Sequence, residues 1–122
     1  MAHAKLNLDL FQQRYEIFEH TWSMLSSTIQ PRPNQASLEK DFANARPRAR
    51  FLFGKEIAEY MDEISRRSTE QQMIMMRTAA RGTVMLPEDV QRHLDNNKFF
   101  LQEASGGARD LFGKYLDFSE WR

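Results

Sequence analysis

The feature that most constrains the fold of this chain is a row of seven apolar side chains near its N-terminus. They recur in steps of three and four residues: Leu8, Phe11, Tyr15, Phe18, Trp22, Leu25 and Ile29. On an α-helix these steps place all seven along one side, and that side must be buried against other helices. We therefore predict that the whole row is buried and that the chain folds as a helical bundle.

Length and composition limit the classes of protein to which the chain can belong. Its 122 residues fit one domain, residues 1–122, and its 17 basic residues balance its 17 acidic ones. A neutral balance supplies no overall field that would attract nucleic acid or an anionic membrane. No apolar run approaches the ~20 residues needed to span a bilayer. We expect no membrane insertion by this chain, with a longer, membrane-tethered form as the alternative, and the absence of cysteine favours the cytoplasm.

Prolines mark the ends and the interior of the first two predicted helices. The first helix is expected over residues 7–30, because Pro31 and Pro33 cannot continue it. Ser37 is the expected N-cap of the second helix. Pro47 lies inside that helix, where it removes a backbone donor. We expect a kink at Pro47, with a short helix followed by a turn before RARFLF as the alternative.

Glycines divide the rest of the chain. Gly54 is expected to end the second helix in the left-handed conformation, and the third helix should end near Gly82. The predicted core stripe of the third helix is Ile57, Tyr60, Met61, Ile64, Ser68, Gln71, Met75 and Ala79. Pro87 begins a fourth helix, whose predicted stripe is Val90, Leu94, Asn97, Leu101, Ala104, Ala108, Leu111 and Tyr115.

These elements predict an all-α, antiparallel four-helix bundle with a short, kinked second helix. The stripe of the fourth helix keeps its phase across Gly106 and Gly107, so we predict one helix with two tolerated glycines. A break at the glycine pair is the alternative, because each glycine costs ~1 kcal/mol relative to alanine. The C-terminal segment is expected to pack Phe118 or Trp121 on the bundle.

Three stretches of the chain carry a family resemblance: LDLFQQRYEIFEHTW, ARFLFGKEIAEYMDEISRR and LFGKYLDF. They resemble a loosely defined group of small, uncharacterised bacterial helical proteins. In that group a D-L-F-x-x-R-[FY]-x-[IV]-[FY] opening, an [AE]-x-F-L-F-G-x-E-[IV]-x-x-Y-[LM]-x-E-I centre and an F-x-x-Y-L-D-F ending recur. Some members carry a transmembrane segment just before the opening, so the resemblance implies a relation to a membrane-tethered module. No activity comes with it.

Residues that could carry chemistry are scattered. A di-iron bundle needs E-x-x-H pairs on facing helices, and this chain has none. The histidines His3, His20 and His93 lie far apart in sequence, and His20 with Glu16 forms an ordinary i,i+4 surface pair. Glycine-rich phosphate loops are also absent from the sequence. We therefore predict no catalytic, cofactor or metal site, and a protein that is not an enzyme.

An alternative function rests on Arg14 and His20, which form an R-x5-H pattern. The pattern resembles the nuclease motif of the helical HEPN ribonucleases and would imply a small RNA-processing enzyme. Six residues on a straight helix turn about 600°, so the two side chains should diverge by roughly 120°. The spacing therefore disfavours this alternative.

A second alternative is nucleic-acid binding by Arg46, Arg48 and Arg50, the densest basic run in the chain. Phe51 and Phe53 beside it could stack on bases, but they fit the core better. No wider basic surface supports the run. We expect an exposed helix face there and no nucleic-acid partner.

Methionines near the end of the third helix suggest a surface for protein binding. Met73, Met75 and Met76 cannot all lie on one core stripe, and methionine adapts well to varied partner surfaces. Met73 and Met76 are therefore the candidate partner surface. The predicted function is a non-enzymatic interaction module that binds an unknown protein or a second copy of itself.

Overall fold

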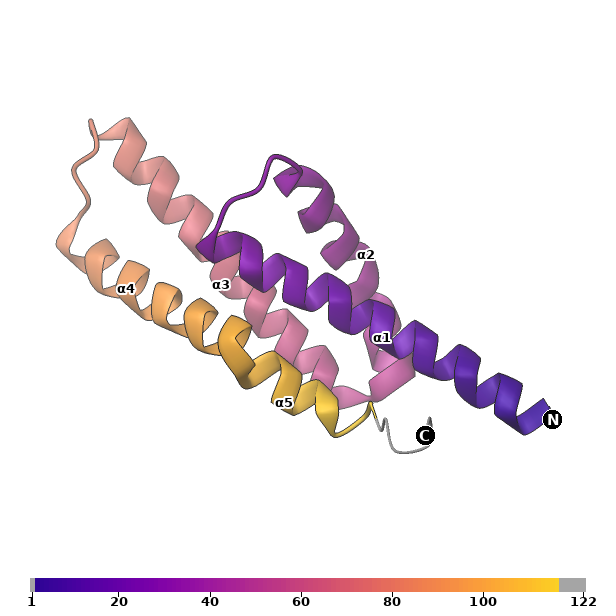
Figure 1. The fold of residues 1–122 in the computed structure, drawn as a ribbon. Helices are drawn as coiled ribbons and strands as arrows, with labels where there is room; N and C mark the ends of the chain where they lie inside the picture. The colour runs from indigo at the N-terminus through magenta and orange to yellow at the C-terminus, as the bar shows by residue number, and fades with distance from the viewer. Residues whose placement is uncertain (1, 117–122) are drawn as a thin grey trace.

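The computed structural model describes the backbone of residues 2–116 and the side chains of residues 8–116. Its helices are α1 (Ala2–Ile29), α2 (Gln35–Phe53), α3 (Lys55–Ala80) and α4 (Pro87–Gln102). A π-helical turn, Glu103–Gly107, and α5 (Ala108–Gly113) continue α4. Since α4, the π-turn and α5 form one rod, the described residues make four antiparallel helical rods and no strand (Figure 1). The predicted all-α four-helix bundle is confirmed, and the predictions for Phe118 and Trp121 lie outside the described residues.

The helices pack in chain order around a common core. α1 packs against α2 and against the α4–α5 rod, and α3 packs against α2 and α4. α1 and α3 lie diagonally and share few contacts. The end of α3 and the start of α4 extend past the C-terminal end of α1, so a two-helix hairpin projects from the bundle (Figure 1). Among the described residues, no helix covers this hairpin on the α1 side.

The apolar row of α1 divides into two rows that each repeat every seven residues. Leu25 is fully buried, and Phe11 and Phe18 are half-buried against the core. The other row stays 37–42% exposed and consists of Leu8, Tyr15, Trp22 and Ile29. The prediction that all seven are buried is therefore wrong. Residues spaced three and four apart cover a wider sector of α1 than the sector that contacts the other helices. Part of the buried face of α1 is formed instead by Ile17, Thr21 and Met24.

An aromatic cluster forms the centre of the core at the end of the bundle that contains α5. Phe112 is fully buried, and its ring meets Phe18 edge-on with centroids 5.3 Å apart. It meets Phe53 at 5.1 Å and Tyr60 at 6.3 Å, also edge-on. Edge-to-face contacts of this kind stabilise aromatic pairs beyond their burial. Phe112 therefore ties α5 to α1, α2 and α3 at once.

The ends of α2 differ in part from the prediction. Asn34 precedes the first residue of α2, and Ser37 lies inside the first turn, so the predicted N-cap is wrong. The helix starts as soon as the chain has passed Pro33. α2 then continues through Pro47 without the predicted alternative break. Gly54 is the single residue between α2 and α3, and its φ of +98° with ψ of −162° is a conformation open essentially to glycine alone.

The π-turn changes which side of the fourth rod faces the core. The backbone N–H of Ala108 donates to the carbonyl of Glu103, five residues earlier. This geometry inserts an extra residue into the helix and shifts its phase. The residues buried before the turn are Asp89, Asn96 and Phe100, and those after it are Ala108, Phe112 and Leu116. The predicted uninterrupted stripe is therefore wrong, although the rod does continue through both glycines.

The predicted stripe of α3 is correct only for its first half. Ile57, Met61, Ile64 and Ser68 are buried. Beyond them the buried positions move to Ile74 and Thr78, which face α4, while Met75 is 48% exposed. The change occurs where α3 extends past α1, because α4 is then the neighbour that covers it.

Phe112→Ala should lower the free energy of unfolding by ~3–5 kcal/mol, because it empties the centre of the aromatic cluster. Phe51→Ala is the matched control, since Phe51 is 91% exposed and its loss should change stability by less than about 0.5 kcal/mol. Urea denaturation followed by circular dichroism measures both. Equal losses in the two variants would contradict the assignment of the core.

The glycine pair should respond asymmetrically to alanine. A Cβ at Gly107 would lie 2.4 Å from Glu103 Oε1, whereas a Cβ at Gly106 meets its nearest neighbour, Arg109, at 3.5 Å. Alanine favours a helix interior more than glycine does, so Gly106→Ala should stabilise the fold by up to ~1 kcal/mol. Gly107→Ala should be at least ~1 kcal/mol less favourable, because it displaces the Glu103 carboxylate that accepts a 2.8 Å hydrogen bond from Tyr60. Thermal melts of both variants would test this; equal effects would contradict it.

Candidate interaction surface

The seam between α3 and α4 in the projecting hairpin is mainly polar. Arg77 of α3 donates two hydrogen bonds to Asp89 of α4, at 3.1 and 2.8 Å. Arg92 of α4 pairs with Glu70 of α3. Ile74 is the buried apolar side chain of α3 at this level. The hairpin is thus held together largely by charge-assisted hydrogen bonds.

Asn96 is the central polar residue of this seam and is almost completely buried. Its side-chain amide donates to Glu70 at 2.9 Å, and its carbonyl oxygen accepts from Arg67 at 3.1 Å. These contacts satisfy both ends of the amide. The hydrogen bond from Asn96, and then that from Arg92, holds the pKa of Glu70 below its usual value.

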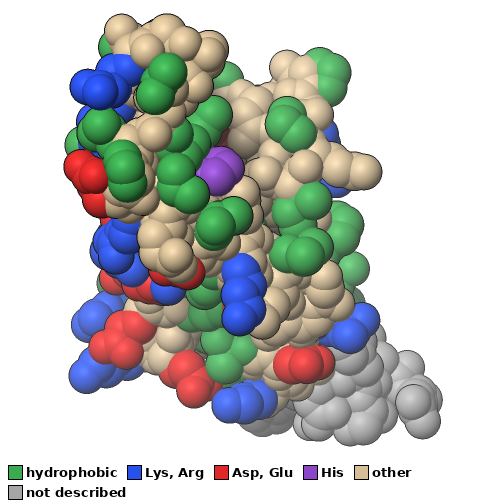
Figure 2. All heavy atoms as spheres, turned by 90° about the vertical axis from the view of Figure 1, so that its left-hand side faces the viewer, with side chains coloured by type: hydrophobic (Ala, Val, Ile, Leu, Met, Phe, Trp, Pro, Cys, Tyr) green, Lys and Arg blue, Asp and Glu red, His purple; other side chains and the backbone are tan. Residues whose placement is uncertain are grey.

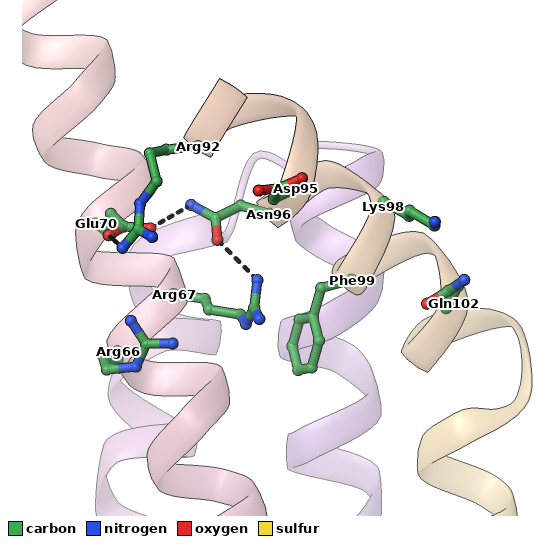
Figure 3. Close-up of a pocket in the computed structure, with 9 residues that line it drawn as sticks. All are labelled: Arg66, Arg67, Glu70, Arg92, Asp95, Asn96, Lys98, Phe99 and Gln102. Carbon is green, nitrogen blue, oxygen red and sulfur yellow. Dashed lines mark hydrogen bonds and ion pairs between the residues drawn. The ribbon is translucent and has the colours of Figure 1, made fainter. Parts of the chain in front are cut away.

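A polar groove of about 300 Å³ lies on the outer side of the seam (Figure 3). Its lining residues are Arg66, Arg67, Glu70, Arg92, Asp95, Asn96, Lys98, Phe99 and Gln102. The guanidinium of Arg67 lies 4.4 Å from the centre of the Phe99 ring, a cation–π contact that fixes its position.

The groove offers little for catalysis, because its arginines already have acidic neighbours. Arg66 and Arg67 both donate to Glu63, and these hydrogen bonds hold the pKa of Glu63 below its usual value. Arg92 is paired with Glu70. None of the residues that line the groove is a cysteine, serine, threonine or histidine that could act as a nucleophile or a base near neutral pH. The groove is better explained as part of the seam.

Beside the groove, another side of α4 carries exposed apolar side chains. Val90, Leu94 and Leu101 are 41%, 56% and 55% exposed. They follow one another at helical spacing and lie on one side of α4. Trp22 and Ile29 of α1 are 41% and 42% exposed, and we group them with these three residues of α4. We call these five residues the apolar strip.

A hydrogen bond fixes how α1 and α4 lie along the strip. The indole N–H of Trp22 donates to the carbonyl of Ala104 at 3.2 Å, so Trp22 lies one turn from Leu101. Ile29 is roughly 10 Å farther along α1, and on the antiparallel α4 the same distance leads back about seven residues. Ile29 therefore lies at a level between Leu94 and Leu101. Trp22 and Ile29 thus flank Leu101 along the α1–α4 contact, and Leu94 and Val90 continue the strip past the end of α1.

The three methionines near the end of α3 are exposed but face different directions. Met73 is 52% exposed and lines a shallow depression with Arg66, Thr69, Glu70 and Arg77, away from the apolar strip. Met76 is 72% exposed, and Met75 lies in line with the core stripe of α3 but remains 48% exposed. Viewed from the side of the α3–α4 connection, hydrophobic side chains gather over the upper part of the molecule (Figure 2). The partner surface at Met73 and Met76 stays a prediction.

Arg14 and His20 do not share a site. Arg14 donates to the carbonyl of Leu52 at 2.7 Å and to that of Tyr115 at 3.4 Å, and it lies over the ring of Phe53. It therefore binds free carbonyls near the end of α2 and after α5. His20 instead lies 3.4 Å from Glu16, the i,i+4 neighbour that the sequence predicts.

The basic run of α2 separates in the same way. Arg46 donates to Asp62 at 2.7 Å and to Ser65 at 3.1 Å, both on α3. Arg48 lies 3.6 Å from Glu16 on α1. Arg50 makes no side-chain hydrogen bond or ion pair with the described residues. Arg48 thus points to α1, whereas Arg46 and Arg50 line one shallow depression with Asp62, so the three arginines form no single patch.

Comparisons with protein-family models, curated proteins and solved structures found no match to this chain. The resemblance to uncharacterised bacterial helical proteins therefore stays a prediction. None of the helices in the described part of the chain combines the length and apolar character of a membrane span. Among the same residues, no group of three or more His, Cys, Asp or Glu side chains is arranged to hold a metal ion.

The sequence could not identify the apolar strip as a surface. Its members all carry the signature of core residues, and their exposure depends on the π-turn and on the point where α1 ends. One signal does exist. Leu8, Tyr15, Trp22 and Ile29 are each seven residues apart, a spacing that keeps a row straight along a second helix surface.

The polar seam should weaken at acid pH. The hydrogen bond from Arg77 holds the pKa of Asp89 below its usual value, and those from Asn96 and Arg92 do the same for the pKa of Glu70. A carboxyl with a lowered pKa in the folded state stabilises the fold above its unfolded pKa, and this contribution is lost as the pH falls through the folded value. The melting temperature should therefore fall between about pH 5 and pH 2.

Asp89→Asn should lower the melting temperature at neutral pH and reduce its fall at acid pH. Asp110→Asn is the control, because Asp110 is exposed and its carboxylate lies 3.9 Å from Arg109. Melts by circular dichroism at several pH values measure both effects. An acid transition unchanged by Asp89→Asn would show that another group causes it.

Proposed function

We propose that this chain is a non-enzymatic helical interaction module that binds another protein surface through the apolar strip. The observation that supports this proposal is the exposure of five apolar side chains on two adjacent helices. The side chains that are 41–56% exposed there are Trp22, Ile29, Val90, Leu94 and Leu101. Contiguous apolar side chains of this size on a protein surface mark sites of interaction.

The composition of the strip supports binding. Trp22 and the two leucines offer large apolar area, and each Å² removed from water contributes roughly 25 cal/mol. Tryptophan is enriched among the residues that dominate binding energy, and the hydrogen bond to Ala104 already fixes its ring orientation. Little side-chain freedom would be lost at Trp22 when a partner covers it.

The repeat of the outer row favours a helical partner. Tyr15, Trp22 and Ile29 lie seven residues apart, and the pairs Leu94 with Leu101 and Val90 with Asn97 have the same separation. A seven-residue period keeps a row facing one partner helix over several turns. A helix or a two-helix layer therefore fits the strip better than an extended peptide does.

The alternative of an RNA-processing enzyme has no specific observation in its favour. Arg14, which would have to contact RNA, donates to the carbonyls of Leu52 and Tyr115. We propose a cytoplasmic location on the cysteine-free composition alone. Met73 and Met76 remain a second, smaller candidate surface in this proposal.

Photo-crosslinking in the native host tests the proposal. A benzophenone amino acid replaces Leu94 in the strip, and in the control it replaces Gln91, an exposed residue on the outer side of α4. We expect a discrete crosslinked species from position 94, identified by mass spectrometry, and none or far less from position 91. The species from position 94 should disappear when Leu101 is also changed to lysine.

Two results would contradict the proposal. The first is the absence of any specific adduct at position 94, whether with another protein or with a second copy. The second is an adduct that forms equally at both positions, since it would reflect exposure and not binding.

A further inference from the structure

We infer that α4 packs in two registers and that the π-turn is the switch between them. In the first register, which the structure shows, the apolar strip residues of α4 face outward. In the second register α4 is turned about its axis by one residue, and these side chains face the other helices. The two registers are a property of the fold itself. Only their consequence for binding rests on the proposed function.

The second register follows from the period of the helix. An α-helix presents the same face every seven residues, because seven residues make nearly two turns. Leu101 and Leu94 precede the fully buried Ala108 by seven and fourteen residues, yet both are more than half exposed. The π-turn between them and Ala108 causes this difference, because it holds one residue more than an α-turn does. If the same residues formed an unbroken α-helix, α4 would turn by about 100° and Leu101 would take the place that Phe100 has now.

Each register buries apolar side chains of α4. Phe100 is 1% exposed and anchors the first register. The second register would bury Leu101 in the same place and cover Val90 and Leu94, which are now 41% and 56% exposed. Val90 would also replace Asp89, a carboxylate that is now buried in the seam. The sequence of α4 therefore contains two apolar faces, one residue apart, and either of them suits the core.

The centre of the polar seam also suits both registers. Asn96 donates to Glu70 and accepts from Arg67 in the first register. A second asparagine, Asn97, follows it directly in the sequence. A turn by one residue brings Asn97 to the place of Asn96, so an asparagine lies opposite Arg67 and Glu70 in either register. The seam therefore does not have to lose its central hydrogen bonds when α4 turns.

The connection between α3 and α4 is strained in the first register. Gly82 and Thr83 have φ angles of +70° and +71°. A positive φ is unfavourable for a β-branched residue such as threonine. The connection consists only of residues 81–86, so its backbone must change when α4 turns about its axis. Strain of this kind is typical of segments that change conformation, and here it lies at the free end of the helix that turns.

Two hydrogen bonds and one glycine hold the first register. Tyr60 donates to the Glu103 carboxylate at 2.8 Å, and this carboxylate occupies the space beside Gly107 where a Cβ would lie. The indole N–H of Trp22 donates to the carbonyl of Ala104, inside the π-turn, at 3.2 Å. In an unbroken α-helix that carbonyl would accept from the backbone N–H four residues later. A partner that covers the apolar strip would also favour the first register, because only this register presents the strip.

Two variants at the glycine pair test the inference, because both disfavour the π-turn but leave α4 in different registers. Gly107→Ala keeps every residue, favours an α-helix and would place its Cβ 2.4 Å from Glu103 Oε1, so it should move α4 to the second register. Deletion of Gly106 removes the extra residue. Phe100 then precedes Ala108 by seven residues, so an unbroken helix keeps it on the core side and holds the first register.

Thiol labelling reports the register, because the chain has no cysteine of its own. Leu101→Cys is exposed in the first register and buried in the second. Gln102→Cys is the control, since it is exposed in the first register and would take the exposed place of Leu101 in the second. We expect Gly107→Ala to slow the labelling of residue 101 by roughly tenfold or more, and the deletion of Gly106 to leave it within about threefold of the parent. Residue 102 should be labelled at the parent rate throughout.

Glu103→Ala tests the same switch without an added Cβ. It removes the acceptor of the Tyr60 hydrogen bond while both glycines stay, so it should slow the labelling of residue 101 by about twofold or more. The inference is overturned if neither Glu103→Ala nor Gly107→Ala slows this labelling, or if the deletion of Gly106 slows it as much as Gly107→Ala does. A Gly107→Ala chain without a cooperative thermal melt would also overturn it, because the second register would then not be a packed state.

The crosslink from position 94 separates this inference from the proposed function. Gly107→Ala should abolish that crosslink, because Leu94 loses its exposure in the second register, whereas the deletion of Gly106 should keep it. Labelling that follows the register without a specific crosslink in any variant leaves the two registers intact and refutes the interaction module. A specific crosslink from position 94 together with unchanged labelling of residue 101 does the reverse.

Discussion

The structure depends on the way α1 uses two apolar rows at once. Phe11, Phe18 and Leu25 face the core, where Phe18 meets the central ring of Phe112. The outer row, which includes Trp22 and Ile29, stands beside α4 and remains exposed. Because both rows repeat every seven residues, a rotation of α1 that buried the outer row would expose part of the inner one. The packing of the core and the presence of the apolar strip therefore have one cause.

The π-turn has a comparable effect on the fourth rod. Without the extra residue, the uninterrupted phase would turn Val90, Leu94 and Leu101 toward the core together with Leu111 and Tyr115. With it, Phe100 and Phe112 are both buried, and the three apolar residues face outward. Gly107 makes this geometry possible, because the Glu103 carboxylate occupies the space where a Cβ would stand. The hydrogen bond from Tyr60 then holds that carboxylate in place.

Much of the fold could be predicted from the sequence, because helix periodicity, prolines and glycines act locally. The four rods, the loop after α1 and the need for glycine at Gly54 all follow from such local signals. The inward side of α4 could not be predicted, since a π-turn has no reliable sequence signal and shifts every position before it. The exposure of Trp22 could not be predicted from the sequence either. It depends on how wide a sector of α1 the other helices cover, which is a property of the assembled bundle.

The projecting hairpin has polar side chains where its two helices meet and apolar side chains on its surface. In the projecting hairpin the inner seam contains Asn96 and the Arg77–Asp89 pair, while Leu94 and Val90 face outward. Buried polar pairs specify which residues meet, but they stabilise a helix pair less than apolar packing of similar volume. The hairpin therefore has less apolar support than the rest of the bundle. A protein that covers the apolar strip would supply it, so binding should stabilise this end of the molecule more than the aromatic core around Phe112.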